Sequence, residues 1–367
     1  MMKRNILAVV IPALLAAGAA NAAEVYNKDG NKLDLNGRVH AGYTFNSSFE
    51  DDTNSDNTYA RLGFKGETQI SNELTGYGRF EYQFDGSVPE SETDGSDSKT
   101  RYAFAGLKFG DFGSFDYGRN LGIAYDGLAY TDVLPENGGE SSITDTLTGR
   151  TGNAATYRNN NFFGLVDGLN FGLQYVAKDQ DNGTTRIDRQ HGDAWGTSLS
   201  YDTDIGLSFV GSYASYKRTL NQQNDGKGRR AEIWTTGVKY DANNVYLAAT
   251  YGEGRNFFRT GYSDADTKTI ADKSQIFEAV AQYTFDFGLT PQLAYVSRKD
   301  KVESGINSTR ANDYSVQYVS VGGTYAFNKN FSAYAEYDID LLDDDSDYRS
   351  RTSNYGDRVD VGIIYQF

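Results

Sequence analysis

The sequence has 367 residues, a formal net charge of −15, no cysteine and a mean hydropathy of −0.60. The negative charge argues against a nucleic-acid partner, because phosphates require a basic surface. The absence of cysteine excludes disulfide and thiol chemistry, and the low hydropathy excludes a helical membrane protein. Only 4 prolines accompany 40 glycines, 28 tyrosines and 21 phenylalanines, which favours a chain made mostly of β-sheet, since proline removes a ladder hydrogen bond.

The first 22 residues differ from the rest. Lys3 and Arg4 precede an apolar run over residues 6–20, and Ala20-Asn21-Ala22 resembles a signal-peptidase site. The run is too short to span a bilayer as a helix, which needs about 20 apolar residues. We therefore expect residues 1–22 to be a cleaved signal peptide rather than an N-terminal anchor. The mature domain would be residues 23–367, with a net charge of −17 once Lys3 and Arg4 are removed.

Residues 33–45 alternate between apolar and polar side chains with a period of two, as expected for a strand with one apolar face. Residues 59–70 and 74–84 repeat the pattern, with Arg61, Arg79 and Glu81 on the polar face. These segments are longer than the ~5–6 residues usual in soluble sheets. Long, half-polar strands indicate a barrel in a membrane more than a soluble sandwich.

The connections between such segments alternate between short and long. Seven short turns are expected near residues 71–72, 110–111, 166–167, 202–204, 241–244, 286–288 and 328–330. Eight long polar loops are expected near residues 46–58, 85–98, 120–149, 178–194, 217–231, 252–274, 298–314 and 341–357. Together they join about sixteen strands, with short turns at one rim and long loops at the other, which is the outer-membrane pattern.

In a membrane the sheet must close on itself, because hydrocarbon offers no hydrogen-bond partner to the backbone groups at a free edge. A Lys or Arg on the lipid face costs ~2–4 kcal/mol at the bilayer midplane, so Arg38, Arg61, Arg79 and Glu81 must face the lumen. Sixteen strands enclose an aqueous channel rather than a filled core. The final residues alternate up to Phe367, so we expect the C-terminus to be part of the wall.

The sequence resembles the general diffusion porins of enteric bacteria (the OmpC, OmpF and PhoE group) over the whole mature chain. The resemblance is carried by the segments at residues 24–35, 59–68, 113–120 and 161–169, and by the closing Tyr365-Gln366-Phe367. It implies an all-β, transmembrane antiparallel barrel of sixteen strands, with short periplasmic turns, long extracellular loops and the third loop folded into the lumen. It further implies a homotrimer in the outer membrane of a Gram-negative bacterium. The channel would pass ions and small hydrophilic solutes by passive diffusion, without a cofactor or metal.

The resemblance also implies site residues, which we place by matching the family's motifs. On the third loop the acidic side of a pore constriction would be Asp132, Glu136 and Glu140, and the basic side on the facing wall would be Arg38, Arg61, Arg101 and Arg150. Asn137 stands where the family usually has Phe, which predicts looser loop packing, and Glu140 replaces a more usual Asp. Glu90 of the second loop would pair with Arg119 of a neighbouring subunit. Lipopolysaccharide, outer-membrane lipid and, through Phe367, the barrel assembly machinery are further implied partners.

The same residues also bear on other functions. An enzyme would need a base, and the sequence offers His40, expected to line the lumen, and His191, expected to be solvated in a polar loop. A sugar-specific porin would need an aromatic slide in the lumen, for which only Tyr59 and Tyr77 lie on the polar face. Residues 50–52 and 343–347 are acidic clusters. We interpret them as solvated loops. The alternative is that they bind divalent cations together with lipopolysaccharide phosphates. An adhesin or phage-receptor role would use the outer loops and could coexist with a channel. We expect a mild preference for cations.

Overall fold

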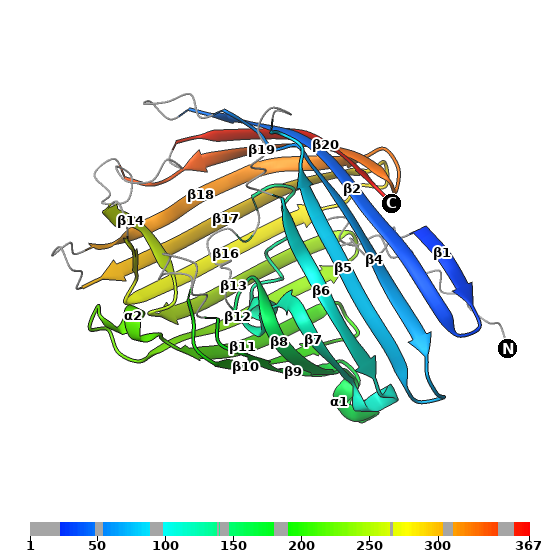
Figure 1. The fold of residues 1–367 in the computed structure, drawn as a ribbon. Helices are drawn as coiled ribbons and strands as arrows, with labels where there is room; N and C mark the ends of the chain where they lie inside the picture. Colours follow the sequence, from blue (N-terminus) through cyan, green and yellow to red (C-terminus); the bar gives the residue numbers. More distant parts are fainter. Residues whose placement is uncertain are drawn as a thin grey trace.

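The computed structural model describes residues 23–47, 54–88, 98–137, 139, 147–179, 190–264, 267–303, 311–343 and 356–367. Within them sixteen antiparallel strands form a closed barrel, in which each strand pairs with the next along the chain and β20 pairs back onto β2 (Figure 1). The expected strand number and topology are confirmed. The barrel strands are β2 (Asn31–Asn46), β4 (Tyr59–Gln69), β5 (Thr75–Asp85), β6 (Lys99–Lys108), β7 (Ser114–Leu121), β8 (Arg150–Asn159), β9 (Leu169–Val176), β10 (Ala194–Asp202), β11 (Leu207–Lys217), β12 (Arg230–Ala242), β13 (Val245–Arg255), β16 (Lys273–Tyr283), β17 (Leu289–Val302), β18 (Ala311–Ala326), β19 (Phe331–Asp340) and β20 (Arg358–Gln366).

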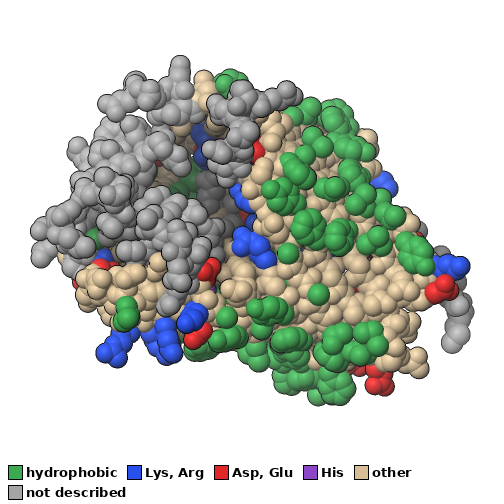
Figure 2. All heavy atoms as spheres, viewed as in Figure 1, with side chains coloured by type: hydrophobic (Ala, Val, Ile, Leu, Met, Phe, Trp, Pro, Cys, Tyr) green, Lys and Arg blue, Asp and Glu red, His purple; other side chains and the backbone are tan. Residues whose placement is uncertain are grey.

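The alternation expected from the sequence sets the two faces of this wall. In β4 the Leu62 and Phe64 side chains are each 46% exposed on the outside, whereas in β5 Glu81 and Gln83 are 6% and 8% exposed on the inside. Figure 2 shows hydrophobic side chains spread over the outer surface of the strands. A wall that is apolar outside and polar inside matches a barrel with lipid around it and water within.

Two chain segments, one near each end of the chain, pair with the same edge of β2. The short strand β1 (Ala23–Lys28) pairs with the start of β2, and β20 pairs with the rest of it. The backbone of Phe367 exchanges two hydrogen bonds of 2.8 and 3.0 Å with Gly37, and its ring occupies space that a side chain at Gly37 would fill. The expectation that the terminal aromatic residue belongs to the wall is therefore confirmed.

All seven short turns fall where the sequence predicts them, and eight longer connections alternate with them. Two turns carry single-turn helices, η1 (Gly110–Phe112) and α1 (Asn161–Gly164), and the long connections carry η2 (Ile123–Gly127), α2 (Leu220–Gln223) and β3 (Ser55–Asp56). The connection expected over residues 252–274 is shorter than predicted, because β13 and β16 extend into it and it also holds the hairpin β14 (Arg259–Asp264) and β15 (Thr267–Ile270). Among the described residues, no helix is long and apolar enough to cross a bilayer.

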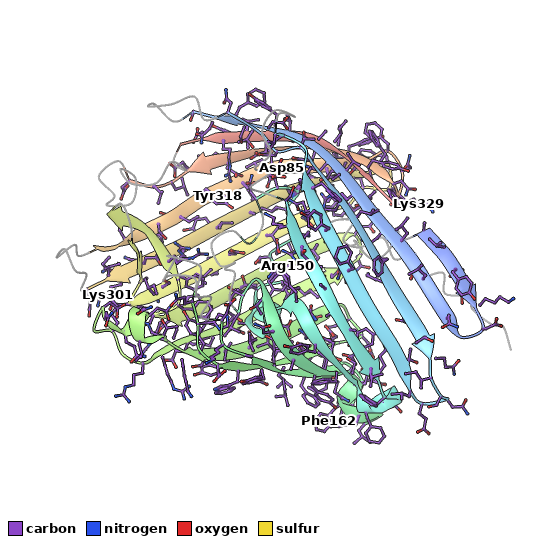
Figure 3. All side chains as sticks on the ribbon, in the orientation of Figure 1. Asp85, Arg150, Phe162, Lys301, Tyr318 and Lys329 are labelled. Atoms are coloured by element: carbon purple, nitrogen blue, oxygen red, sulfur yellow. The ribbon has the colours of Figure 1, made fainter. Side chains whose placement is uncertain are left out.

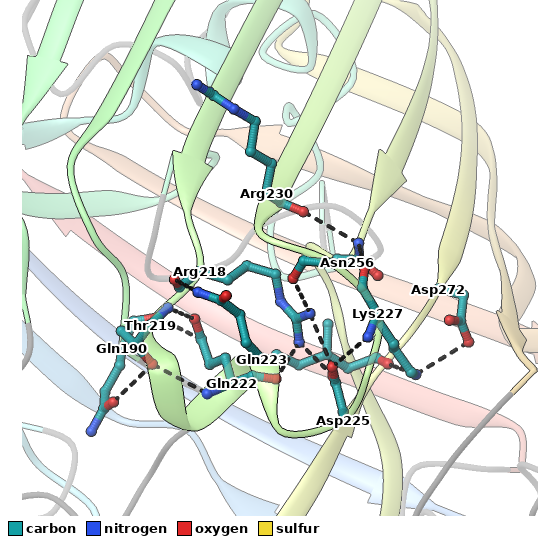
Figure 4. Close-up of polar contacts among 12 residues, drawn as sticks. Gln190, Arg218, Thr219, Gln222, Gln223, Asp225, Lys227, Arg230, Asn256 and Asp272 are labelled. Atoms are coloured by element: carbon teal, nitrogen blue, oxygen red, sulfur yellow. Dashed lines mark hydrogen bonds and ion pairs between the residues drawn. The ribbon is translucent and has the colours of Figure 1, made fainter.

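Polar contacts tie several outer loops together at the end of the barrel opposite the short turns (Figure 4). The buried guanidinium of Arg218 binds the Asp225 carboxylate and donates a hydrogen bond of 2.8 Å to the Gln222 carbonyl. Lys227 pairs with Asp272 at 3.1 Å and so joins two loops. Both cations are almost fully buried and paired, so the connection after β11 is held to the one after β13.

Candidate functional site

The long connection after β7, residues 122–149, turns into the barrel and is fastened to the inner wall. The Gln174 side chain holds the start of this connection in place. It accepts a hydrogen bond from the Ile123 N–H at 2.9 Å and donates one to the Leu121 carbonyl at 2.8 Å. Ile123 is fully buried against inward residues of the wall. Gly127 allows close approach, since a Cβ there would stand 2.1 Å from the Thr235 hydroxyl oxygen. The third loop therefore lies along the lumen, as expected.

Further along, polar and apolar contacts hold the loop against β8–β17. Arg158 donates two hydrogen bonds to the Asp126 carboxylate, at 2.8 and 3.0 Å. The Thr131 hydroxyl donates to the buried Glu278 carboxylate at 2.7 Å. Val133 and Leu134 then pack on a cluster of apolar wall residues, namely Ala248, Val280 and Ala294. The contacts of Thr131, Val133 and Leu134 join positions more than a hundred residues apart in the sequence, and together with the Arg158–Asp126 pair they fix the path of the loop.

The end of this segment carries Glu136 into a buried polar cluster. Its carboxylate lies 3.4 Å from His40 Nε2 and 3.4 Å from the Tyr334 hydroxyl, which itself lies 2.8 Å from the same histidine nitrogen. The His40 ring stacks on Tyr59, with 4.7 Å between ring centroids. His40 points inward as expected, but it is fully buried beneath the loop and does not line the open channel. The loop covers it because Glu136 docks there.

Asn137 is held more firmly than its departure from the family pattern predicts. Its side chain is 2% exposed, and its amide donates a hydrogen bond of 2.7 Å to the Asp360 carboxylate on β20. The Tyr318 hydroxyl donates to the Asn137 carbonyl, also at 2.7 Å. The expectation of looser packing is therefore wrong, because a polar side chain replaces ring packing with a hydrogen bond to a charged acceptor.

The facing wall, β2 to β8, presents a row of arginines to the lumen. Arg61 donates to Gln83 at 2.8 Å, and Arg101 donates to Glu81 at 2.6 Å. Arg79, which the sequence placed in the lumen but not in the site, also binds Glu81 at 2.8 Å and lies over the Tyr102 ring. The Nε atoms of Arg38 and Arg150 have no hydrogen-bond partner within the described ranges. Figure 3 places Arg150 between the two ends of the barrel, which Lys301 and Lys329 mark.

Asp132 is an acidic residue of the third loop on which arginines of β2 to β8 act. Tyr125 donates a hydrogen bond of 2.5 Å to its carboxylate, and the positive charges of Arg150 and Arg101 act on it. Burial raises the pKa of Asp132 above its ordinary value, and the hydrogen bond and the two arginines oppose that shift. The third loop therefore brings an acidic side chain within electrostatic reach of the arginines of the wall.

Most of the expected site residues that the structure describes are brought together. Asp132 and Glu136 lie on the third loop, and Arg38, Arg61, Arg101 and Arg150 lie on β2, β4, β6 and at the start of β8. Glu140 and Glu90 lie outside the described residues, as do residues 50–52 and 344–347. His191 is buried beside Tyr216 rather than solvated, since it forms an isolated β-bridge with Asp179. In the described part of the chain, no group of three His, Cys, Asp or Glu side chains could hold a metal ion.

Comparison with known proteins identifies the architecture. The family model described as Gram-negative porin matches residues 28–367. The chain belongs to the Gram-negative porin family. It is 53% identical to outer membrane protein F of Serratia marcescens over 380 residues and 51% identical to outer membrane porin F of Escherichia coli (strain K12) over 373 residues, in each case covering all of both chains. The structure of Salmonella typhi OmpF in complex with daunomycin superposes with a TM-score of 0.86 at 45% identity, over 94% of this chain and 100% of that chain.

Membership of the family settles the general activity. The porin is a passive channel of the Gram-negative outer membrane and not an enzyme, and the family to which it belongs forms homotrimers and passes small solutes. His40 and His191 therefore need no catalytic interpretation. The aromatic slide also finds no support, because Tyr59 stacks on His40 and Tyr77 donates a hydrogen bond of 3.0 Å to Asp116.

Proposed function

We propose that this porin selects ions and solutes by a transverse electric field at its third loop, with a mild preference for cations. Asp132, Glu136 and Glu140 form the acidic side, and Arg38, Arg61, Arg101 and Arg150 form the basic side. The observation that carries the proposal is the position of Asp132 on the third loop, within electrostatic reach of the inward-facing Arg101 and Arg150 of the wall. Charges at such a constriction are partly desolvated, so their field is screened less than at an open surface.

The cation preference follows from the balance of charge along the lumen. The mature chain would carry −17, and Glu81 offsets the charges of Arg79 and Arg101. The arginine row opposes cation entry, so the preference is modest. In a planar bilayer with a salt gradient, the reversal potential should have the sign of a cation-preferring pore.

Two variants test the assignment of the basic side. Arg61→Ala and Arg101→Ala should each raise the cation-to-anion permeability ratio and let bulky zwitterions pass faster. Lys299→Met is the matched control, since it removes one positive charge from the outer face of β17. An unchanged ratio in both arginine variants, or an equal change in the control, would remove these arginines from the constriction.

The signal peptide is residues 1–22, and the mature porin begins at Ala23. Strand β1 starts at that residue, where it pairs with Leu35, while Phe367 pairs with Gly37 two positions along the same strand. Cleavage after Ala22 thus creates an α-amino group near the terminal carboxylate, and the two opposite charges attract each other. The intact mass of the protein extracted from outer membranes tests this assignment, and a mass that includes residues 1–22 would contradict it.

A subunit contact explains an arginine on the outside of the barrel. Cross-strand partners share a face, and Phe80, Ala103 and Arg119 form one row across β5, β6 and β7 in which Phe80 and Ala103 are exposed outward. An arginine facing lipid would be costly. Arg119 donates a hydrogen bond of 2.8 Å to the Thr100 carbonyl, which is a neutral acceptor, and Glu90 of a neighbouring subunit in the trimer supplies a carboxylate. A cycle of Glu90→Gln, Arg119→Gln and the double variant, read as the temperature of trimer dissociation, should show coupling between the two positions, and additive effects would contradict it.

Lipopolysaccharide binds the outer face near the long loops. Arg255, Lys273 and Lys301 lie directly opposite one another on β13, β16 and β17, with side chains 63%, 37% and 45% exposed. Glu253 pairs with Arg255 and Lys273, at 3.4 and 2.8 Å, and Glu303 pairs with Lys301, so the row holds three cations against two carboxylates. Lipid phosphates supply the remaining negative charge. Lipid A should raise the heat stability of the porin in detergent, and Lys273→Met should reduce that gain more than the lumen variant Lys65→Met. Equal gains would refute the site.

The barrel assembly machinery recognises the last strand through Phe367. The ring of this residue lies over Gly37 on the lipid-facing side of the wall, where an assembly factor could reach it before the barrel closes. Phe367→Ala should lower the yield of assembled porin in the outer membrane. Chemical refolding of the same variant in detergent separates a recognition defect from a loss of stability.

A further inference from the structure

A recess lies under the third loop on the side of the short turns. It is an open recess of about 630 Å³ between the loop residues Asp126 and Tyr130 and inward-facing residues of β8–β12. Lys239 and Asp202, which line it, stand a few residues from the turns that end their strands, so the recess opens toward the periplasm. Cavities of 300–1,000 Å³ are the usual size for small-molecule sites. The recess is separate from the arginine row, which lies on the facing wall.

The back of the recess is electrically neutral. Arg158 and Asp126 form a two-point ion pair, and the Ser198 hydroxyl donates to the same carboxylate at 2.6 Å. These groups therefore satisfy one another. They give the recess a rigid polar wall but leave little unpaired charge for a solute.

Two other charges in the recess are not neutralised by each other. The Lys239 ammonium lies 5.1 Å from the centroid of the Tyr130 ring, and no carboxylate within the described ranges comes within ion-pair distance of it. Asp202 accepts a hydrogen bond of 3.0 Å from Asn170 and likewise has no cationic partner among the residues described. In register, Asp202 pairs with Ser208, which pairs with Lys239. The two backbones are therefore two strand spacings, roughly 10 Å, apart on one inward row.

Tyr130 and Val210 complete the surface between these charges. Tyr130 contributes an aromatic face from the loop, and Val210 is a nearly buried apolar residue on β11. Burial and, after it, the nearby Asp202 carboxylate raise the pKa of Tyr130 to about 12, so its hydroxyl stays neutral at physiological pH and can donate a hydrogen bond. Across the recess, the Lys239 cation is therefore followed by the apolar and aromatic surface of Val210 and Tyr130, and then by the Asp202 anion.

We propose that this recess binds small zwitterions that carry an ammonium and a carboxylate group, such as short peptides, with the carboxylate at Lys239 and the ammonium at Asp202. A dipeptide places its two charges several ångströms apart, which suits two protein charges separated by two strand spacings. The site extends the function of the channel, because a solute that has crossed the constriction is held once more before it leaves. It does not depend on the assignment of the arginine row.

Single-channel recording with the dipeptide Ala-Ala tests the proposal. Wild-type porin inserted in one orientation should show current interruptions at lower peptide concentration when Ala-Ala is added on the side of the short turns. Lys239→Met and Asp202→Asn should each weaken this block at least tenfold, which corresponds to about 1.4 kcal/mol. N-acetyl-Ala-Ala and Ala-Ala-amide, which each lack one of the two charges, should block weakly in the wild type.

Lys65→Met is the matched control, because Lys65 also faces the lumen near the short turns but on the other wall, and it should leave the block unchanged. Equal block by wild type and Lys239→Met, or by the charged and capped peptides, would overturn the proposal. If either single variant fails to assemble, the exchanged pair Lys239→Asp with Asp202→Lys supplies the test, since it should keep the block. A wild-type protein without any conductance would instead refute the channel itself.

Discussion

Asn137 offers the sharpest test of how the third loop is held. Asn137→Ala removes the hydrogen bond to Asp360 and leaves the backbone contact from Tyr318 in place. A hydrogen bond to a charged group contributes about 1.5–3 kcal/mol. Asp360 keeps contacts to Thr44 and to Arg358, so its charge is not stranded and the lower part of that range applies. At 1.4 kcal/mol for each factor of ten, the population of detached loop ends should rise about ten- to thirtyfold.

The assay is the fraction of time that single channels of Asn137→Ala spend in conductance levels other than the main open level. Tyr318→Phe removes a hydrogen bond between neutral groups and should have a smaller effect. Asn312→Ala, at an exposed asparagine near the start of β18, is the matched control and should behave as wild type. If Asn137→Ala spends no more time outside the main open level than the control does, the Asn137 amide does not restrain the loop.

Three further outcomes are expected. Because the pKa of Asp132 is raised above 3.8, this carboxyl gains a proton at higher pH than exposed aspartates, so acidification should shift the reversal potential toward anions, and Asp132→Asn should remove that early shift. The same shift makes ionised Asp132 a cost to folding at neutral pH, and this cost disappears as the pH falls. Deleting Phe367 removes two backbone hydrogen bonds to Gly37 and should lower the unfolding temperature in detergent. Leu62→Arg places a charge on the lipid face and should cost ~2–4 kcal/mol in bilayer folding measurements, whereas Leu62→Val should cost far less.

The sequence predicted the wall far better than the loops. Arg38 and Arg61 could be assigned to the lumen from alternation alone, because hydrocarbon excludes charge and a strand has only two faces. Periodicity cannot say what covers an inward residue. His40 was correctly turned inward, but its burial depends on Glu136 arriving from a loop almost a hundred residues away.

Other departures have the same origin. The hairpin β14–β15 and the burial of His191 arise from contacts between loops, which leave no periodic signal in the sequence. The anchoring of Asn137 cannot be predicted from the family pattern, because that pattern shows the loss of a ring at this position and not the Asp360 carboxylate that faces it on β20. Motifs located the site residues, and only coordinates could show which of them touch.

The shared place of β1 and β20 along β2 means that the order of strands around the barrel has no privileged starting point. Residues 23 and 367 face positions only two residues apart on one strand, so a linker of very few residues could join them without disturbing the register. New chain ends could then be opened in an outer loop other than the third, which is fastened inside the barrel. The barrel would keep the same strand pairing with a different strand as the first one. This geometry therefore predicts that a circularly permuted porin can fold.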